Sequence, residues 1–591
     1  MKKNKNLSEL MGYAGKHKYL TYASLILSVI SAFFALLPFV FIFFIIKEVI
    51  EVTPNYSEAA DVVRNGWLAV LFALISIVIY ISGLLCSHLS AFRIAGNMRK
   101  TLMSHIAKLP LGFVGEMGSG KIRRIVNDSS AATETYLAHQ LPDMAGAIAT
   151  PLGMIVMLFL FDWRFGLICL VPVVLGFAAM FKMAGPKMAD DMKNYQNALA
   201  DMNNEAVEYV RGIPVVKTFG QTVHTFKRFK GSIDNYYKFC ISYCKKCRMP
   251  MLLYTVCINS AFAFLITLAL ILTGGESVAQ SVLLSFIFYV IFTPVIATSM
   301  SKVLYMSENG MVVTDALERV HSILDMKPLP DAVKNEKPKD NSVEFKNVSF
   351  RYSGAETDAL QDVSFKVQSG ETIALVGPSG GGKTTAAGLI SRFWDVSAGE
   401  IKVGGVNVKS IKKSELMETV SYVFQDSRLL KTSIFENVRL SRPNASRKEV
   451  EFALHKAQCD DIIAKLPNGI DTIIGAKGVY LSGGEQQRIS IARVMLKNAQ
   501  IIVLDEATAF ADPENEALVQ KAFEELSKDK TVIMIAHRLT TVRNADRIFV
   551  LKDGKIEESG THNVLAEKKG LYAKMWKDYQ TSVSWKVGGA K

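Results

Sequence analysis

The sequence predicts an α-helical domain that crosses a membrane six times, followed by an α/β domain that holds a nucleotide phosphate. Six long apolar runs occupy the N-terminal half of the chain, and each is long enough to cross a hydrocarbon core of about 30 Å. A glycine-rich loop, Gly377–Thr385, follows directly on the apolar run Ile373–Val376. A buried strand, a glycine-rich turn and a Lys-Thr pair that opens a helix form a cradle for a phosphate anion.

The composition agrees with membrane insertion. The chain has 591 residues, which is too long for one ordinary domain, and 50% of them are hydrophobic. A net charge of +13 indicates either a nucleic-acid partner or an anionic membrane surface. Seven scattered cysteines disfavour a disulfide framework and are compatible with a reducing cytosolic face.

The six spans are predicted at Tyr19–Ile46, Trp67–Leu85, Leu141–Phe161, Phe165–Phe181, Met249–Leu272 and Val282–Val303. Only Asp162–Arg164 separates the third span from the fourth, which predicts a tight helical hairpin. The long polar segments after the second and fourth spans have a helix-permissive composition. We therefore expect spans two to five to continue as helices well into the cytosol.

The basic residues predict the orientation of the spans. Lysines and arginines concentrate before span one, between spans two and three, and in residues 182–248. Because cytoplasmic loops carry an excess of these residues, those segments are predicted to be cytosolic. The positive charge is then mainly explained by the orientation of the spans in the membrane. Little of it remains to support a nucleic-acid partner. The expected location is the cytoplasmic membrane, with the C-terminal domain in the cytosol.

Residues of the glycine-rich loop are expected to bind the nucleotide directly. Glycines let the backbone approach the phosphates without a Cβ in the way, Lys383 reaches the β/γ oxygens, and the Thr384 hydroxyl suits Mg²⁺. The predicted phosphate-binding set is Gly377, Ser379, Gly380, Gly382, Lys383, Thr384 and Thr385.

Two further motifs point to one class of ATPase. Leu481-Ser482-Gly483-Gly484-Glu485 stands at a presumed helix start, and Ile501–Glu506 is a buried-strand run that ends in two carboxylates. With these motifs in this order, the chain resembles the ATP-binding cassette (ABC) ATPases, whose Leu-Ser-Gly-Gly signature separates them from helicases and other phosphate-loop enzymes. The six spans and long intracellular helices resemble a half-transporter of the ABC exporter fold.

Two intracellular segments are similar to the loops that hold the coupling helices of that family. Leu109-Pro110, Gly115–Met117 and Asn127-Asp128 resemble the first loop, and Val210–Gly220 resembles the second. In the family these loops press on the ATPase domains. The alternative is that they are solvated loops whose sequence only happens to be similar to that of the family.

The resemblance implies a role for each of five residues, with ATP and Mg²⁺ as cofactors. Tyr352 matches the aromatic residue that stacks on adenine, and Gln425 the glutamine that contacts Mg²⁺ and the attacking water. Asp505 would hold Mg²⁺ through its water shell, Glu506 would polarise the attacking water, and His537 would donate to the γ-phosphate. An ordinary strand tyrosine remains the alternative for Tyr352.

The signature implies a dimer. In the family, Ser482, Gly483 and Gly484 cap the nucleotide of a second ATPase domain, and Asp512 would carry cross-talk between the two sites. One chain has one ATPase domain, so a second half-transporter is required. A paralogous heterodimer is favoured over a homodimer.

The chain departs from the usual exporter pattern at three places. Gly475–Gly478 lacks the acidic residue of the Gly-Glu-x-Gly stretch, Glu485 stands where many exporters have Gln, and the segment after Glu506 lacks the commoner Ser-x-Leu-Asp. The last two departures remove no catalytic group. Every group needed for hydrolysis is present, so an active ATPase is expected.

The predicted boundaries are a transmembrane domain at 1–325, a linker at 326–341, an ATPase domain at 342–580 and a tail at 581–591. Cys240, Cys244 and Cys247 have the spacing of a radical-type iron–sulfur motif and would share one helix face. Simple packing is favoured, because the segment precedes a span and lacks the barrel or Rossmann-like context of such chemistry.

Substrate and direction are less defined by the sequence. Phe510–Glu516 and Ala316–Val320 resemble the paired half-transporters that take up ferric siderophores such as yersiniabactin and mycobactin. The spans hold almost no ionisable residue at mid-depth, which suits a small amphipathic substrate. The competing hypothesis is a lipid, drug or peptide exporter of the same fold. No peptidase-like segment precedes span one, which disfavours leader-cleaving peptide export.

Two other classes of protein are the remaining alternatives. A soluble ABC ATPase of chromosome or ribosome type has the same ATPase motifs, but the six spans count against it. An ABC-related receptor or channel that uses ATP only for gating predicts currents without accumulation against a gradient.

Overall fold

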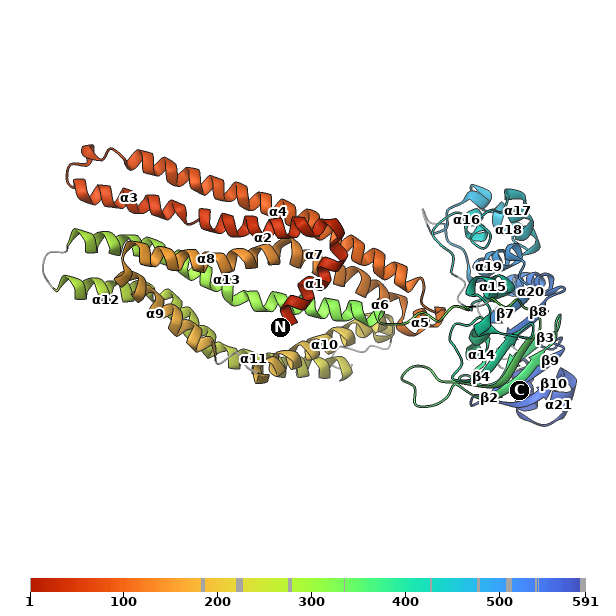
Figure 1. The fold of residues 1–591 in the computed structure, drawn as a ribbon. Helices are drawn as coiled ribbons and strands as arrows, with labels where there is room; N and C mark the ends of the chain where they lie inside the picture. Colours follow the sequence, from red (N-terminus) through yellow and green to blue (C-terminus); the bar gives the residue numbers. More distant parts are fainter. Residues whose placement is uncertain are drawn as a thin grey trace. The chain divides into compact units, whose positions relative to one another are not determined.

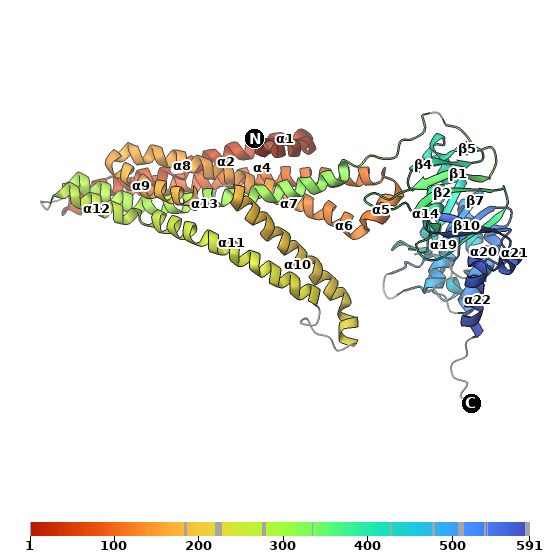
Figure 2. The same ribbon diagram turned by 90° about the horizontal axis from the view of Figure 1, so that it is seen from below.

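The computed structural model describes residues 2–181, 186–218, 227–274, 279–333, 335–425, 428–475, 479–505, 513–536, 539 and 542–584. They form two compact units, Met1–Ile106 with Arg123–Asp325, and Ala107–Ile122 with Met326–Lys591. The first unit is helical, and the second contains sheets covered by helices (Figures 1 and 2). The predicted order, a helical domain followed by an α/β domain, is confirmed.

The helices before residue 325 are α1 (Lys2–Ala14), α2 (Lys18–Phe34), α3 (Leu37–Val52), α4 (Val62–Ile106), α5 (Leu111–Met117), α6 (Ser119–Arg124), α7 (Ser130–Thr135), α8 (Leu141–Phe161), α9 (Trp163–Met180), α10 (Pro186–Thr218), α11 (Lys227–Asn259), α12 (Ala261–Thr273) and α13 (Gln280–Leu324). Two π-helical turns, Ile125–Ser129 and Tyr136–Gln140, flank α7. Of these helices, α5 and the part of α6 up to Ile122 belong to the second unit.

Within the described residues, five helical stretches are long and apolar enough to cross a membrane. They are Asn6–Val52, Val62–Ile106, Ser119–Phe161, Trp163–Met180 and Gln280–Val303. The pair α11 and α12, which is bent by 42°, makes a sixth if it forms one span. Each of these stretches overlaps one of the six predicted spans.

Several helices continue far beyond the apolar runs. Helices α4 and α13 have 45 residues each, and α10 and α11 have 33 each. At about 1.5 Å per residue, a 45-residue helix is about 68 Å long, roughly twice the hydrocarbon thickness. The helices α4 and α13 run along the long axis of the first unit (Figure 1).

The hairpin between the third and fourth spans is as tight as predicted. Helix α8 ends at Phe161 and α9 begins at Trp163. The carboxylate of Asp162 caps α9 by accepting a 3.0 Å hydrogen bond from the Arg164 backbone N–H. It also accepts a 3.2 Å hydrogen bond from the Ser285 hydroxyl on α13, which ties the hairpin to the last span.

The strands of the second unit are β1 (Val343–Phe350), β2 (Leu360–Val367), β3 (Thr372–Val376), β4 (Ala398–Val403), β5 (Val406–Asn407), β6 (Val420–Val423), β7 (Ile501–Asp505), β8 (Thr531–Ile535), β9 (Arg547–Lys552) and β10 (Lys555–Gly560). They form a four-stranded sheet in the order β2-β1-β4-β5 and a six-stranded sheet in the order β10-β9-β3-β8-β7-β6. Strand β3 pairs in parallel with both β8 and β9, so it lies inside the larger sheet.

The helices of the second unit after residue 325 are α14 (Lys383–Ile390), α15 (Lys413–Thr419), α16 (Ile434–Arg439), α17 (Arg447–Lys456), α18 (Asp460–Ala464), α19 (Gly483–Lys497), α20 (Pro513–Ser527), α21 (His562–Glu567) and α22 (Leu571–Ser584). One core joins α14 to residues of both sheets. A second core packs α16 to α20 against β6, β7 and β8, and a third packs α21 and α22 against β3 and β9.

The segment predicted as a linker is bonded to the second unit. Arg392 donates a 2.9 Å hydrogen bond to the carbonyl of Pro330, and the Asp331 carboxylate accepts one of 3.1 Å from the backbone of Lys413. The Asn335 amide donates to Glu415 at 2.7 Å. This stretch therefore has a defined course along the unit.

Candidate functional site

The glycine-rich loop joins β3 to α14 at the carboxyl end of the larger sheet. The last four residues of β3 are buried, and α14 begins at Lys383. Gly377 has φ +140, and a Cβ there would lie 1.9 Å from the carbonyl oxygen of Leu551 on β9. Gly382 has φ +95, and its Cβ would lie 2.6 Å from the Ala359 carbonyl oxygen. Both positions therefore require glycine.

Lys383 is only 4% exposed and turns back over the loop. Its ammonium donates hydrogen bonds of 2.9 and 2.8 Å to the carbonyl oxygens of Gly377 and Pro378. The α14 N-terminus contributes backbone N–H groups that point out of the helix end. A buried cation and a helix N-terminus at one loop make a site for an anion.

A cavity of about 470 Å³ opens at this loop. It is lined by Tyr352, Ala359, Ser379, Gly380, Gly381, Gly382, Lys383, Thr384, Thr385 and Gln425. The structure thus brings the predicted stacking aromatic, most of the predicted phosphate-binding residues and Gln425 to one place. Gly377 does not line the cavity, and its close approach to Leu551 shapes the start of the loop.

Tyr352 is anchored at the edge of this cavity. Its hydroxyl lies 2.8 Å from the Thr385 hydroxyl of α14. Its ring meets the Trp394 ring edge-on, with centroids 5.3 Å apart and planes at 90°. Burial raises the pKa of Tyr352, so the phenol stays neutral at physiological pH. A neutral, oriented aromatic ring beside a phosphate loop suits the stacking of a nucleotide base.

The predicted metal ligands are Thr384, Gln425 and Asp505. Thr384 and Gln425 line the same cavity, and Asp505 ends β7, a strand of the same sheet. Oδ2 of Asp505 accepts a 2.9 Å hydrogen bond from the Tyr422 hydroxyl, and burial raises the pKa of Tyr422. All three ligands offer hard oxygen atoms, which is the donor set that fits Mg²⁺.

The signature segment forms the N-terminus of α19. The Ser482 hydroxyl accepts from the Glu485 N–H at 3.4 Å, and the Glu485 carboxylate accepts from the Ser482 N–H at 2.8 Å. This reciprocal pair is a capping box, so the Glu that replaces the commoner Gln has a structural role. Ser482, Gly483 and Gly484 do not line the cavity at the glycine-rich loop.

Arg488, which anchors α19, is not among the residues predicted from the sequence. This side chain is fully buried and donates to both carboxylate oxygens of Asp461, at 2.7 and 3.0 Å, and to Asn515 at 2.8 Å. It also donates to the carbonyl of Gln458. Burial alone would raise the pKa of Asp461, but the pairing with Arg488 outweighs it, so the pKa is lowered. An arginine one turn after the signature was the available signal.

Three predicted residues, Glu506, Asp512 and His537, lie outside the residues that the structure describes. The strands that lead toward Glu506 and His537 are described. Strands β7 and β8 are parallel neighbours, and Asp505 is in register with Ile535. Both chain segments therefore leave the sheet at the same edge.

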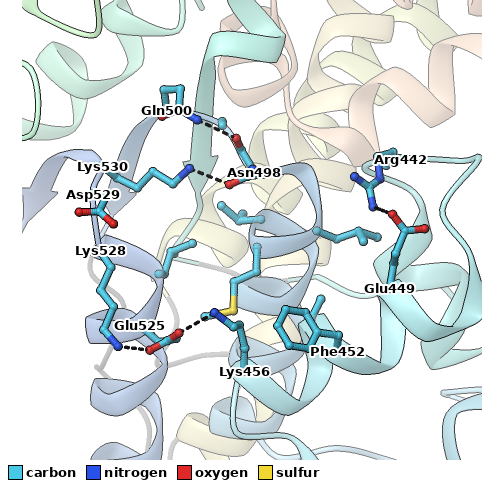
Figure 3. Close-up of a pocket in the computed structure, with 16 residues that line it drawn as sticks. Arg442, Glu449, Phe452, Lys456, Asn498, Gln500, Glu525, Lys528, Asp529 and Lys530 are labelled. Atoms are coloured by element: carbon cyan, nitrogen blue, oxygen red, sulfur yellow. Dashed lines mark hydrogen bonds and ion pairs between the residues drawn. The ribbon is translucent and has the colours of Figure 1, made fainter.

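A second cavity, of about 600 Å³, lies among α17, the end of α19 and the end of α20 (Figure 3). Its lysines are hydrogen-bonded within the cavity: Lys456 and Lys528 both donate to Glu525, and Lys530 donates to Asn498. Hydrogen bonds from the two lysines lower the pKa of Glu525 to about 2. This cavity contains none of the predicted nucleotide-binding residues.

The cysteine cluster lies on α11. Cys247 is buried, Cys240 is half-buried and Cys244 is exposed. Among the residues with described positions, no three His, Cys, Asp or Glu side chains converge on a common metal position.

Both parts of the chain match known protein families. Residues 22–295 match the ABC transporter transmembrane region, and residues 360–509 match the ABC transporter family of ATP-binding domains.

Curated relatives include transporters of two kinds. The mycobactin import ATP-binding/permease protein IrtA of Mycolicibacterium smegmatis is 36% identical over 503 residues, which are 83% of this chain and 57% of that protein. The IrtA of Mycobacterium tuberculosis is 35% identical over 84% of this chain and 57% of its own length. The chain thus spans less than two thirds of these relatives. The ATP-dependent lipid A-core flippase of Escherichia coli (strain UTI89) is 32% identical over 86% of this chain and 87% of that protein.

A solved structure of a bacterial Atm1-family ABC exporter with ATP bound is similar in fold. The TM-score is 0.69 at 24% sequence identity, and the match covers 96% of this chain and 99% of the other.

Proposed function

This chain belongs to the ABC transporter family, and on that premise we propose that it is one half of a transporter that uses ATP to move a small amphipathic molecule across the cytoplasmic membrane. It is a multi-pass membrane protein with its ATPase domain in the cytosol. The observation that carries the proposal is the cavity where Tyr352, Lys383 and Gln425 meet. A base-stacking ring, a phosphate-binding ammonium and a hard metal ligand converge there in a chain that also spans the membrane.

The residues of the site divide the binding of ATP among them. Tyr352 supports the adenine ring, and the N–H groups at the start of α14 bind the phosphates. Lys383 exchanges its two loop carbonyls for phosphate oxygens. Thr384, Gln425 and Asp505 would hold Mg²⁺, which would neutralise phosphate charge during phosphoryl transfer.

Hydrolysis is assigned to residues that follow two neighbouring strands. Glu506 directly follows Asp505 of β7 and is proposed to take a proton from the attacking water. His537 follows β8 and is proposed to donate to the γ-phosphate. The support is the parallel register of Asp505 with Ile535, which directs both segments to one edge of the sheet.

We propose that two half-transporters pair to complete each ATP site. The signature residues Ser482, Gly483 and Gly484 lie at the N-terminus of a 15-residue helix and do not line the cavity of their own chain, and Ser482 and Gly483 are exposed. A helix N-terminus is a favourable partner for a γ-phosphate, here one bound by the second half-transporter. Asp512 is proposed to communicate between the two sites. A paralogous partner is favoured because the sequence of Phe510–Glu516 resembles that of paired siderophore transporters.

Import of a ferric siderophore is the proposed transport reaction. Its support is the 36% identity to a protein named for mycobactin import, together with spans that hold few ionisable side chains. Lipid export is the second candidate. It is favoured by the lipid A-core flippases, which match over more than four fifths of both chains.

The experiment that tests the proposal uses proteoliposomes in which the ATPase domains face outward. The chain is reconstituted alone and with any copurifying partner, and a candidate substrate is either trapped in the lumen or added outside. Stimulation of ATPase activity by a luminal ferric siderophore, with ATP-dependent exit, supports import. Stimulation only by externally added lipids or lipophilic compounds, with their uptake into the lumen, replaces import with export.

The variant Glu506→Gln serves as the control for coupling. It is expected to retain ATP and to lose turnover by about a hundredfold or more, because general-base catalysis contributes at least that much. Phosphate release at the wild-type rate from this variant would contradict the assignment of Glu506 and with it the proposed hydrolysis mechanism.

A further inference from the structure

Helix α5, which interrupts the membrane-spanning part of the sequence, belongs structurally to the ATPase unit. Residues Ala107–Ile122 group with Met326–Lys591 and not with their sequence neighbours. One contact of this segment is unusually close: a Cβ on buried Gly112 would lie 2.0 Å from Cε2 of Trp394. The indole N–H of Trp394 also donates a 2.9 Å hydrogen bond to the Glu116 carboxylate. Helix α5 therefore contacts the indole ring in two ways, by close packing at Gly112 and by a hydrogen bond to Glu116.

The same ring of Trp394 contacts the elements that build the nucleotide cavity. It meets Tyr352 edge-on at 5.3 Å and Phe350 of β1 at 5.6 Å. On α14, a Cβ at Gly388 would lie 2.9 Å from Cζ3 of Trp394. Two glycines, one on α5 and one on α14, thus leave space for one indole, and larger residues at either place would displace it.

A chain of contacts leads from the base pocket to α5. The Tyr352 hydroxyl lies 2.8 Å from that of Thr385, the Tyr352 ring abuts Trp394, and Trp394 donates to Glu116. Glu116 and Trp394 are 278 positions apart in the sequence. The indole is rigid and enclosed by Gly112 and Gly388, so it transmits a displacement of the Tyr352 ring instead of absorbing it.

We propose that Trp394 is a positioning residue that couples occupation of the base pocket to helix α5 through Gly112 and Glu116. The inference rests on the proposed function, in which Tyr352 stacks on the adenine ring. It goes further in one respect: the base, and not only the phosphates, acts on α5. A triphosphate without a base fills the phosphate loop but leaves Tyr352, and hence Trp394, where they were.

The test compares Mg·ATP with Mg·tripolyphosphate on the full-length protein in nanodiscs, together with its partner if one copurifies. Hydrogen exchange is followed in the peptides that cover residues 107–122. In the wild type, ATP is expected to slow exchange there at least about twofold more than tripolyphosphate at equal site occupancy. In Trp394→Phe, which keeps a ring but lacks the N–H group, this difference is expected to disappear.

Three further variants separate coupling from simple destabilisation. Glu116→Gln keeps an acceptor for the indole N–H and is expected to behave as the wild type, whereas Glu116→Ala is expected to behave as Trp394→Phe. The matched control is Trp576→Phe, because Trp576 packs on His562 of α21 and Tyr579 of α22 in the same unit. This control is expected to keep the full difference between ATP and tripolyphosphate.

Two outcomes would overturn the inference: equal protection of residues 107–122 by both ligands in the wild type, or an undiminished difference in Trp394→Phe. Binding of a fluorescent ATP analogue is measured in parallel. Failure of the wild type to bind that analogue would instead overturn the proposed function, and the inference with it.

Discussion

The Tyr422 hydroxyl donates a 2.9 Å hydrogen bond to Oδ2 of Asp505, between the ends of two neighbouring parallel strands. Tyr422 belongs to β6 and Asp505 ends β7, so the bond crosses the edge of the sheet at which the ATP site is proposed. Because burial raises the pKa of Tyr422, the phenol remains a donor throughout the physiological range. One oxygen of the carboxylate that is proposed to hold Mg²⁺ is thereby oriented.

Removing this hydroxyl is expected to weaken the response to Mg²⁺. The variant Tyr422→Phe loses one hydrogen bond to a charged group, which costs about 1.5 kcal/mol. The Mg²⁺ concentration needed for half-maximal ATPase activity should therefore rise about tenfold. The measurement is a Mg²⁺ titration at saturating ATP. The same change at exposed Tyr237 should have no effect, and an unaltered Mg²⁺ requirement in Tyr422→Phe would refute a role for the hydroxyl.

Gly382 is expected to tolerate no side chain. Its φ is +95, and a Cβ would lie 2.6 Å from the Ala359 carbonyl oxygen, at the N-terminus of the phosphate-binding helix. Gly382→Ala is expected to lower ATP affinity at least about tenfold, because the clash adds to a left-handed strain of about 1–2 kcal/mol. Equilibrium ATP binding tests this.

Gly405 supplies the matched control for Gly382→Ala. It has φ +77, and nothing lies within 4 Å of a Cβ there. Gly405→Ala carries the strain without the clash and lies outside the site, so its ATP affinity should equal that of the wild type. Comparable losses in both variants would mean that backbone strain, and not the shape of the loop, limits binding.

The capping box of α19 predicts that glutamine is tolerated at position 485 and alanine is not. The Ser482 N–H donates a 2.8 Å hydrogen bond to the Glu485 carboxylate. A glutamine at this position would offer its side-chain carbonyl oxygen to the same N–H group. Glu485→Ala is expected to destabilise the ATPase unit by about 1 kcal/mol, whereas Glu485→Gln stays near the wild type. Thermal unfolding followed by fluorescence distinguishes them. Equal unfolding temperatures for the two variants would contradict a capping role.

The Arg488–Asp461 pair predicts a stability that depends on pH. The pKa of Asp461 is lowered in the folded protein, so its contribution is complete above the ordinary value of about 3.9 and is lost as the pH falls through the lowered value. Asp461→Asn is expected to lower the free energy of unfolding by about 2 kcal/mol at neutral pH. The gap to the wild type should begin to close near about pH 4, where the unfolded carboxyl takes up its proton, and should keep closing as the pH falls through the lowered pKa of the folded protein.

The measurement for this pair is the unfolding temperature as a function of pH. Asp460→Asn is the control, because Asp460 is the neighbouring carboxylate and pairs with His455 on the surface. A gap between Asp461→Asn and the wild type that does not narrow as the pH falls below about 3.9 would show that the lost contribution is not electrostatic.

The order of the domains and the phosphate loop were predictable because both leave local patterns. Apolar runs of membrane length are visible without any tertiary contact, and they recur as helical stretches that overlap all six predicted spans. The strand-loop-helix order at Gly377–Thr385 is also local, and the loop lies between β3 and α14 as expected. Continuation of spans two and five beyond their apolar runs followed from composition, and α4 has 45 residues and α11 has 33. The 45-residue length of α13, which holds span six, was not predicted.

Several determinants of the site were not predictable because their partners lie far away in sequence. The clash that makes Gly377 obligatory comes from Leu551 on β9, and the bond that orients Asp505 comes from Tyr422, 83 positions earlier. Arg488 was missed for the same reason, since Asp461 and Asn515 each stand 27 positions from it. The predicted residues Glu506, Asp512 and His537 remain sequence predictions.

The sequence by itself therefore determined the class of protein: six apolar segments, a phosphate loop and a signature identify a membrane-bound ATPase, because each is a contiguous run of residues with its own physical meaning. Only the tertiary structure decided which side chains meet. The pairing of β3 with β8 and β9 shapes the loop, and the packing of Trp394 between Gly112 and Gly388 joins α5 to the base pocket. Such contacts depend on how strands and helices are brought together, and no local pattern in the chain records them.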